Sequence, residues 1–366
     1  MKILFITLEQ SARENLKVLL NNNFFKNNDK KIFTFGMSHE NLPFIDLTNI
    51  KIKSIMGFVD ICKNIFYLYK LRNCLHLIEK NNNFSHIIFL DSFDFSKFYL
   101  NKFKNTSVKY CQLIGPSVFI WKKNKAEYIN KHFDHIFSIF EIERQFYKKD
   151  KYSYIGHPLL KNIIINDKER FPIKDIGIFL GSRLQEIQYN MPIIKNLIDR
   201  LKKLSDFNIH FFVTKEFYSL IKVFFNKSFY QFHLNDKYYY YNISKLDFAF
   251  ACSGSVHLEL CFSQIPHFIF YKTNWLNYFI FKIFVKSKYL SLINIFNKKE
   301  YIKEFIQLNF NSNLLINNFN PLFKEKTLFD QYSNSILESV KKSKIQNINS
   351  FKIIDYLKKS SLAIKD

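Results

Sequence analysis

Glycine is scarce in this sequence, with only seven among 366 residues. A chain this poor in glycine keeps it where no side chain fits, because glycine tolerates positive φ and lets the backbone approach a ligand. Where a helix follows such a turn, its unsatisfied N–H groups point at the ligand, and we expect that ligand to be a phosphate. Four glycines lie in short signatures that each follow a strand-like run: Gly115-Pro116-Ser117, Gly156-His157-Pro158, Gly181-Ser182-Arg183 and Ser253-Gly254-Ser255.

Long uncharged apolar runs are absent as well. No stretch of about 18 such residues occurs, so the sequence predicts no membrane-spanning helix. The apolar start of the chain meets Glu9 too early for a signal peptide. We therefore expect a cytoplasmic protein whose contact with a membrane is peripheral.

The cysteines form no Cys-x-x-Cys pair and show no metal-like spacing with histidine. Buried, reduced thiols are the expected state of such residues. The sequence therefore predicts no metal site. The five cysteines are Cys62, Cys74, Cys111, Cys252 and Cys261.

Acidic residues are the minority charge, with 31 Asp and Glu against 54 Lys and Arg, for a formal net charge of +23. The lysines are spread among Asn, Ile and Phe, without a basic tail or an arginine-rich helix, so we expect no nucleic-acid partner. We interpret much of the positive charge as a compositional bias of the chain toward Lys, Asn, Ile and Phe. What remains favours an anionic partner such as a phospholipid surface or a nucleotide.

Short β-rich apolar runs alternate with longer helical stretches along the chain. Continuous apolar runs of this kind indicate parallel strands covered on both faces, and so a doubly wound α/β fold. At 48% hydrophobic residues, the chain has enough apolar material to fill two cores. The strand-like runs are 3–8, 31–36, 86–90, 108–114, 135–140, 176–180, 209–213, 248–252 and 267–271.

The polar segment 166–170, followed by Pro172, interrupts this rhythm and indicates a domain boundary. We predict a Rossmann-like domain over 1–168, a second over 169–335, and C-terminal helices over 336–366 that pack back on an N-terminal domain, of their own chain or of a partner. The two domains would face a cleft. Open α/β sheets bind ligands at the carboxyl ends of their strands, where the glycine signatures lie.

The turn Gly181-Ser182-Arg183 is the first candidate for phosphate binding. Its backbone N–H groups, the Ser182 hydroxyl and the forked Arg183 guanidinium would converge on one anion. The alternative is structural: Ser182 caps the following helix and Arg183 pairs with Glu186. Residue types alone leave both interpretations open.

The turn Ser253-Gly254-Ser255 is the second candidate, because small residues before a helix can form an anion nest. Glu259 lies one helical turn beyond Ser255 and could reach the hydroxyls of a ribose. Taken alone, Glu259 would more often be a solvated helix carboxylate. Two anion-binding turns and an acid in one half of the chain together indicate a nucleoside diphosphate.

Two carboxylates, Asp91 and Asp94, follow the strand-like run 86–90 in the other half. One of them could act as a general base on a hydroxyl nucleophile. Capping of a turn is the alternative. His157 is similarly open: it either donates to a ligand or to the backbone, or it stabilises the turn between the domains.

The stretches 56–70 and 275–288 mix bulky apolar and basic residues. Helices of this composition can lie on a bilayer with lysines at the headgroups, or line a groove for acyl chains. The alternative for both is a core-facing helix with a basic outer face.

In order and spacing, these signatures resemble the lipid-A-disaccharide synthase family, a group of inverting glycosyltransferases with the GT-B fold. The resemblance covers roughly residues 50 to 310, and no single motif would carry it alone. The matching segments are 56–59, 91–95, 116–118 with Trp121, 140–141, 155–159, 181–183 with 186–187, 253–255 with 258–259, and Asn294 followed by Glu304 and Gln307.

That family, from Gram-negative bacteria, joins UDP-2,3-diacylglucosamine to 2,3-diacylglucosamine 1-phosphate (lipid X) through a β-1,6 linkage, at the cytoplasmic face of the inner membrane. The resemblance implies UDP binding in the carboxy-terminal half by Gly181, Ser182, Arg183, Ser253, Gly254, Ser255, Glu259, Asn294, Glu304 and Gln307. It implies binding of the acyl-bearing acceptor by Glu9, Ser11, Met56, Phe58, Ser117, Trp121 and His157.

The resemblance also implies the catalytic roles. Asp91 or Asp94 would take the proton of the attacking acceptor 6-hydroxyl, with inversion at the anomeric carbon. Arg183 and the turn at 253–255 would neutralise the departing diphosphate, so neither a cofactor nor a metal ion is expected. The sequence leaves the oligomeric state open between a monomer and a homodimer.

The segment 8–13 departs from the family, which has a Gly-Glu-x-Ser-Gly-Asp loop at this point. This chain keeps Glu9 and Ser11, lacks both glycines, and carries the basic Arg13 in place of the acid. In the nucleotide turn, Val256 and His257 replace smaller residues. Two alternatives therefore stay open: another UDP-sugar glycosyltransferase of this fold with a lipid-linked acceptor, or a homologue that binds nucleotide or lipid without transfer.

Overall fold

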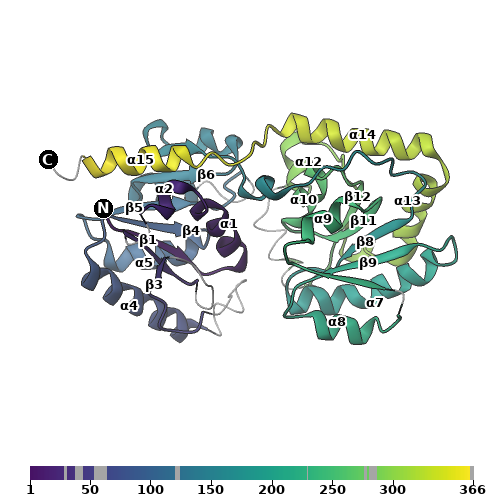
Figure 1. The fold of residues 1–366 in the computed structure, drawn as a ribbon, viewed down its shortest axis with the longest axis horizontal. Helices are drawn as coiled ribbons and strands as arrows, with labels where there is room; N and C mark the ends of the chain where they lie inside the picture. The colour runs from purple at the N-terminus through teal and green to yellow at the C-terminus, as the bar shows by residue number, and fades with distance from the viewer. Residues whose placement is uncertain are drawn as a thin grey trace. The chain divides into compact units, whose positions relative to one another are not determined.

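The computed structural model describes residues 1–28, 31–37, 44–52, 64–119, 124–228, 230–275, 278–279 and 287–362. The chain divides into two compact units (Figure 1). The first combines Met1–Lys161 with Ile345–Asp366, and the second is Asn162–Lys344. The division falls at Asn162, a few residues before the boundary that the polar segment suggests.

The first unit is built on a seven-stranded sheet of order β3-β2-β1-β4-β5-β6-β7, in which every pairing is parallel. The strand order reverses between β1 and β4, which is the point where open α/β sheets bind their ligands. The strands are β1 Ile3–Thr7, β2 Ile32–Phe35, β3 Ile45–Asp46, β4 His86–Leu90, β5 Lys109–Leu113, β6 His135–Ser138 and β7 Tyr152–Tyr154.

Helices cover both faces of this sheet. Leu4 and Ile6 of β1 pack into a cluster with Leu71 and Leu75, while the intervening Phe5 lies edge-on to Phe25 at 5.9 Å. Alternate residues of one strand are thus buried on opposite faces. The helices are α1 Gln10–Leu20, α2 Asn23–Lys26, α4 Ile65–Asn82, α5 Phe93–Phe103, α6 Asn124–His132 and α15 Phe351–Leu362, with 3-10 turns at Glu141–Phe146, Lys149–Lys151 and Pro158–Asn162.

Helix α15 comes last in the chain but lies on the first unit (Figure 1). Its Tyr356 stacks on His135 at 4.1 Å and lies edge-on to Phe137 at 5.5 Å. Its Ser360 hydroxyl is 2.8 Å from His86 Nε2. The segment 336–366 is therefore divided. All of α14, Lys326–Ser343, belongs to the second unit, and α15 completes the first.

The second unit is built on a six-stranded parallel sheet of order β10-β9-β8-β11-β12-β13. Its strands are β8 Asp175–Phe179, β9 Asn208–Val213, β10 Gln231–Leu234, β11 Phe248–Cys252, β12 His267–Tyr271 and β13 Glu304–Ile306. Its other helices are α7 Leu184–Leu201, α8 Tyr218–Phe224, α9 Tyr239–Ser244, α10 Val256–Phe262, α12 Leu292–Asn297 and α13 Ser312–Lys324, with a 3-10 turn at Gln307–Asn309.

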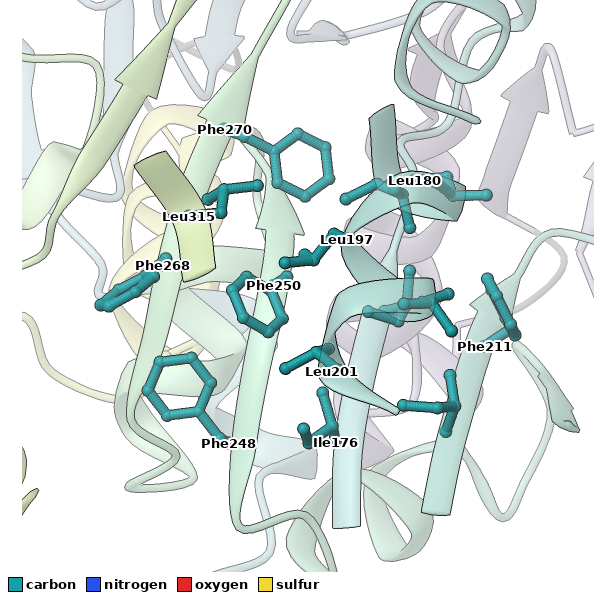
Figure 2. Packing of buried hydrophobic residues seen from close by; sticks show 14 of the residues in the cluster. Ile176, Leu180, Leu197, Leu201, Phe211, Phe248, Phe250, Phe268, Phe270 and Leu315 are labelled. Atoms are coloured by element: carbon teal, nitrogen blue, oxygen red, sulfur yellow. The ribbon is translucent and has the colours of Figure 1, made fainter. Parts of the chain in front are cut away.

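Strand β11 shows how this sheet is filled. Phe248 and Phe250 face the larger cluster, where Leu197 of α7 lies beside Phe250 (Figure 2). Ala249 and Ala251 face the other side, in a smaller cluster with residues of α9 and α10. Large side chains on one face and alanines on the other let α10 approach the strand that ends at the candidate phosphate turn.

The doubly wound α/β class is confirmed, and each of the predicted strand-like runs contains a strand. The strands that the sequence did not predict, β3, β7, β10 and β13, are the edge strands of the two sheets. Among the residues that the structure describes, no helix is both long and apolar enough to cross a bilayer.

Candidate active site

Two of the glycine signatures meet in the second unit. They follow β8 and β11, which are neighbours in the sheet, so both turns lie at its carboxyl edge. Gly181 has φ +111°, and a Cβ at this position would lie 2.9 Å from Glu186 Oε2 and 3.3 Å from Cys252 Sγ. Glycine is required here both by the backbone and by the close approach of β11.

Arg183 is the N-cap residue of α7 and its side chain is 49% exposed. Its Nη1 donates to Glu186 Oε1 at 2.5 Å, and the Glu186 side chain is buried. The pairing of Arg183 with Glu186, expected if the turn is structural, is therefore present. Ser182, which that interpretation made the helix cap, is exposed and is not the N-cap residue. A buried carboxylate thus holds the guanidinium at the mouth of the turn.

The Ser253-Gly254-Ser255 turn is open. The Ser253 N–H donates to Phe270 O at 2.9 Å, whereas Gly254 and Ser255 are exposed. A Cβ added at Gly254 would meet no atom within 4 Å. The turn therefore leaves free space beside the first residues of α10, where an anion can approach backbone N–H groups.

Glu259 of α10 is not a solvated helix carboxylate. It is buried, and burial raises its pKa from the ordinary 4.5 to about 7, partly offset by a hydrogen bond from the Tyr239 hydroxyl. Its Oε2 has no hydrogen-bond partner within the described ranges. A buried acceptor without a donor costs free energy, and a ligand hydroxyl would recover it. Tyr239 gave no signal in the sequence, since it follows the unpredicted strand β10.

Asn294, Glu304 and Gln307 make their hydrogen bonds inside the protein. Glu304 accepts from Leu290 N at 2.7 Å, from Ser291 N at 2.9 Å and from Asn294 Nδ2 at 2.8 Å. Asn294 Oδ1 accepts from Tyr301 N at 2.8 Å and Ile302 N at 3.0 Å. These bonds fix the segment that leads into α12.

Gln307 closes the neighbouring loop. Its side-chain amide bonds both the N–H and the carbonyl of Thr273, at 3.0 and 3.1 Å. Contact of Asn294, Glu304 and Gln307 with a nucleotide stays a prediction, and in the geometry observed all three act as positioning residues.

In the first unit, Asp91 and Asp94 have different surroundings. Asp91 directly follows β4; its N–H donates to Leu113 O at 2.9 Å, its carbonyl accepts from Gln112 Nε2 at 2.7 Å, and burial raises the pKa of its carboxyl. Asp94 lies in the first turn of α5, where its side chain is 70% exposed and pairs with Lys125 Nζ at 3.1 Å.

The backbone at Asp91 and Ser92 is strained. Both residues have positive φ, 54° and 43°, which costs non-glycine residues about 1–3 kcal/mol each. The Ser92 hydroxyl is buried and has no hydrogen-bond partner in the parts of the chain that the structure describes. Strain together with an unsatisfied polar group, next to a half-buried carboxylate, is typical of a functional site.

His157 has the contacts of the turn-stabilising interpretation. Burial lowers the pKa of its ring to about 4, and ring Nδ1 accepts from Leu159 N at 3.3 Å. The backbone N–H of His157 donates to Gln346 O at 2.8 Å. Beside it, Gly156 has φ +79°, and a Cβ there would lie 2.2 Å from Asn347 O. This turn anchors the segment that returns to the first unit, rather than standing between the units.

The other predicted acceptor residues are less informative. Glu9 is the N-cap residue of α1, Ser11 lies in the first turn of that helix, and Ser117 is half-buried in the segment after β5. The remaining three, Met56, Phe58 and Trp121, lie outside the described residues.

Two doubly wound parallel sheets, one with paired glycine turns at its carboxyl edge, define a protein of the GT-B fold class. Solved structures share the fold. The UDP complex of Staphylococcus aureus MnaA superposes with a TM-score of 0.63 at 11% identity, covering 100% of this chain and 98% of its own. Acinetobacter baumannii MurG gives 0.53 at 9% identity, covering 98% and 100%.

The chain belongs to the lipid-A-disaccharide synthetase family, whose sequence model matches residues 3–354. The lipid-A-disaccharide synthase of Rickettsia conorii is 29% identical over 79% of this chain and 67% of its own length. That of Aquifex aeolicus is 27% identical over 89% and 91%. The resemblance seen in the sequence is thereby confirmed, and the protein is an enzyme that transfers a glycosyl group.

Proposed function

We propose that this protein transfers 2,3-diacylglucosamine from UDP-2,3-diacylglucosamine to 2,3-diacylglucosamine 1-phosphate (lipid X). The products are the β-1,6-linked lipid A disaccharide 1-phosphate and UDP, with inversion at the anomeric carbon. The observation that carries the proposal is the family match over residues 3–354, which spans both units.

The donor nucleotide binds at the carboxyl edge of the second sheet. Arg183 and the N–H groups of Gly254 and Ser255 receive the diphosphate, because a fork of guanidinium donors and an open backbone nest both favour phosphate oxygens. Glu259 receives the ribose hydroxyls on the oxygen that lacks a donor. The buried Glu186 carboxylate keeps the Arg183 guanidinium in place through their ion pair.

Asp91 is the general base, and Asp94 is not. Burial raises the pKa of the Asp91 carboxyl, which makes its carboxylate a stronger base for the acceptor hydroxyl. Asp94 is exposed and its charge is paired with Lys125. Asp91 takes the proton of the acceptor 6-hydroxyl while the oxygen attacks the anomeric carbon, and the bonding electrons leave with UDP.

The reaction needs no cofactor and no catalytic metal ion. Charge that develops on the departing diphosphate is stabilised by Arg183 and by backbone N–H groups, which stand ready before the reaction begins. Turnover that is unchanged by EDTA supports this arrangement; turnover that EDTA abolishes and Mg²⁺ restores contradicts it.

The protein works at the cytoplasmic face of the inner membrane. Support comes from apolar residues exposed near basic ones: Phe66 at the start of α4 is 87% exposed and Tyr69 lies one turn further on. Co-sedimentation with vesicles that contain anionic phospholipid measures this binding. Phe66→Asp should weaken the binding, and unchanged binding would place the membrane contact elsewhere.

The segment 8–13 favours a second candidate, a UDP-sugar transferase with another lipid-linked acceptor. Here Leu8 and Ala12 stand where the family has glycine, and Arg13 stands where it has an acid. In the structure this segment begins directly after β1 and includes the first turn of α1. A basic residue there suits an acceptor with more negative charge than the family's own.

One assay separates these candidates. Purified protein is incubated with UDP-2,3-diacylglucosamine and 2,3-diacylglucosamine 1-phosphate, and the products are analysed by mass spectrometry. The tetra-acylated disaccharide phosphate establishes the proposed reaction. UDP binding without this product contradicts it, and points to the second acceptor class or to a binding protein that has lost transfer.

A further inference from the structure

Three metal-ligating side chains meet in the core of the second unit, apart from the residues assigned to catalysis. They are His257 and Cys261 of α10 and His267, the first residue of β12. All three are buried, and their ligand atoms lie within 4.8 Å of one another. The sequence interpretation that no cysteine has metal-like spacing with a histidine is therefore wrong for Cys261: residues i and i+4 share a helix face.

One pair of these atoms is spaced nearly as two ligands of one ion would be. Cys261 Sγ and His267 Nε2 are 4.0 Å apart. Two such ligands of one three-coordinate ion, at about 2.3 Å for sulfur and 2.0–2.1 Å for nitrogen, would be separated by roughly 3.8 Å. A shift of a few tenths of an ångström, well within side-chain adjustment, would bring the two atoms to bonding distance of one ion.

His267 already has the orientation of a metal ligand. Its Nδ1 lies 2.8 Å from Ile265 O, so Nδ1 carries the proton and donates it to that carbonyl. The lone pair of the neutral ring is then on Nε2, the atom that faces Cys261. A histidine ligand that donates its other ring N–H to a carbonyl is the usual arrangement at protein metal sites.

The cluster reaches from His257, which closely follows the 253–255 turn, to the opposite edge of the sheet. His267 opens β12 and so lies at the amino edge of the sheet, opposite the carboxyl edge where Gly181 and Ser253 lie. Tyr332 of α14 donates to His267 O at 2.7 Å and covers this end of the strand. The cluster is closed to solvent, which suits a held ion rather than a reactive one.

The net charge of the three ligands favours a monovalent cation over a divalent one. A thiolate and two neutral imidazoles carry a single negative charge, so a monovalent soft cation leaves the buried site neutral, whereas Zn²⁺ would leave a net positive charge in the core. Zinc also requires a fourth ligand, and the His, Cys, Asp and Glu side chains of the described residues supply three. Thiolate and imidazole ligands suit Cu(I).

We propose that His257, Cys261 and His267 form a buried three-coordinate site for a soft monovalent cation, with Cu(I) as its ion. On binding, the Cys261 thiol loses its proton to solvent and the thiolate coordinates the metal. His257 changes partner as well, because a neutral imidazole has one ring lone pair and that of His257 now accepts from Leu292 N at 3.3 Å. Loading therefore releases the amide of Leu292, the first residue of α12.

The test is an anaerobic titration of the full-length protein with Cu(I) in competition with bicinchoninate, a coloured Cu(I) chelator. We expect the protein to withdraw one Cu(I) per chain from the chelator. X-ray absorption of the loaded protein should show one sulfur and two imidazole nitrogens around copper. Hydrogen exchange of the Leu292 amide should become faster on loading.

Two variants and a control keep the test decisive. Cys261→Ser and His267→Asn should both abolish stoichiometric binding, and the asparagine can retain the bond to Ile265 O. Cys111→Ser, at a buried thiol of the first unit, is the matched control and should keep binding. UDP affinity, measured by calorimetry, verifies that each variant is folded.

Three results would overturn the proposal. They are the absence of stoichiometric Cu(I) binding to the wild-type protein, binding that survives Cys261→Ser, and copper with oxygen neighbours only. If Zn²⁺ at equal concentration displaces Cu(I) from the site, the monovalent assignment is wrong.

Discussion

The turn after β8 in the second unit and the turn after β4 in the first unit both take positive φ, but with different kinds of residue. In the second unit Gly181 takes φ +111°, where a Cβ would lie 2.9 Å from a buried carboxylate. In the first unit Asp91 and Ser92 take positive φ and keep their side chains. At the proposed diphosphate turn this glycine-poor chain uses glycine, whereas at the proposed general base the fold bears the strain of a side chain at positive φ.

The largest expected effect is the loss of turnover on substitution of Asp91. The comparison predicts that this loss comes from removal of the carboxylate and not from relief of the backbone strain. Asp91→Asn should lower turnover by about 10²- to 10⁴-fold, the range for a lost general base, with UDP affinity unchanged. Asp91→Gly should be equally inactive, yet no less stable, because glycine tolerates the backbone conformation.

Asp94→Asn is the matched control for Asp91. Its carboxylate is exposed and paired on the surface, so turnover and stability should both stay close to wild type. Initial rates with saturating donor compare the three variants. Loss of activity in Asp94→Asn with retention in Asp91→Asn would reverse the assignment.

Arg183→Ala comes next. We expect a loss of about 10²- to 10³-fold in kcat, since the transition-state charge on the diphosphate loses its main cation. The half-exposed side chain contributes little packing, so the protein should remain folded. Arg183→Lys separates charge from geometry: it keeps the cation but loses the fork, and partial activity is expected.

Steady-state kinetics and thermal unfolding measure both Arg183 variants. Retained turnover in Arg183→Ala would remove this residue from the site. A collapse in Tm would instead show that its pairing with the buried Glu186 is mainly structural.

Gly181→Ala tests whether the turn after β8 requires glycine. The added Cβ meets Glu186 and forces positive φ on alanine, so the free energy of unfolding should fall by about 1–3 kcal/mol. Gly254→Ala is the control, because open space surrounds that position. Urea unfolding at equilibrium measures both, and equal losses would contradict the distinction.

The smallest effect is a pH dependence at Glu259. Its carboxyl binds its proton more tightly in the folded protein, with a pKa of about 7, than in the unfolded chain, where the ordinary value of 4.5 applies. Ionisation therefore weakens the fold as the pH rises from 4.5 to about 7. The Glu259→Gln variant has no carboxyl to ionise and keeps its stability. The Tm of the variant should therefore rise relative to that of the wild type as the pH increases over that interval. A constant Tm difference would contradict the buried, ionisable state.

The interior of both sheets could be predicted from sequence, and the edges could not. A central parallel strand is buried on both faces and reads as a continuous apolar run, as in Phe248–Cys252. The edge strand Gln231–Leu234 is partly exposed, and Ile45–Asp46 is exposed. Such strands carry no continuous hydrophobic signal.

The candidate site divides in the same way. The turn at Gly181 could be predicted because its spacing is local, and even its Arg183–Glu186 pair lies within one helical turn. The burial of Glu259 beside Tyr239 and the cluster around His267 depend on side chains brought together by the fold. For Cys261, the spacing to His257 was a local signal that the sequence interpretation missed.

The return of α15 to the first unit has a consequence for biosynthesis. Residues 1–161 leave the ribosome first, but the sheet face that Tyr356 covers at His135 and Phe137 stays open until α15 has been made. The second unit, 162–344, is continuous and can fold before that. The half of the enzyme that is translated first is therefore completed last, and its open sheet face is the surface that chaperones would have to protect in the meantime.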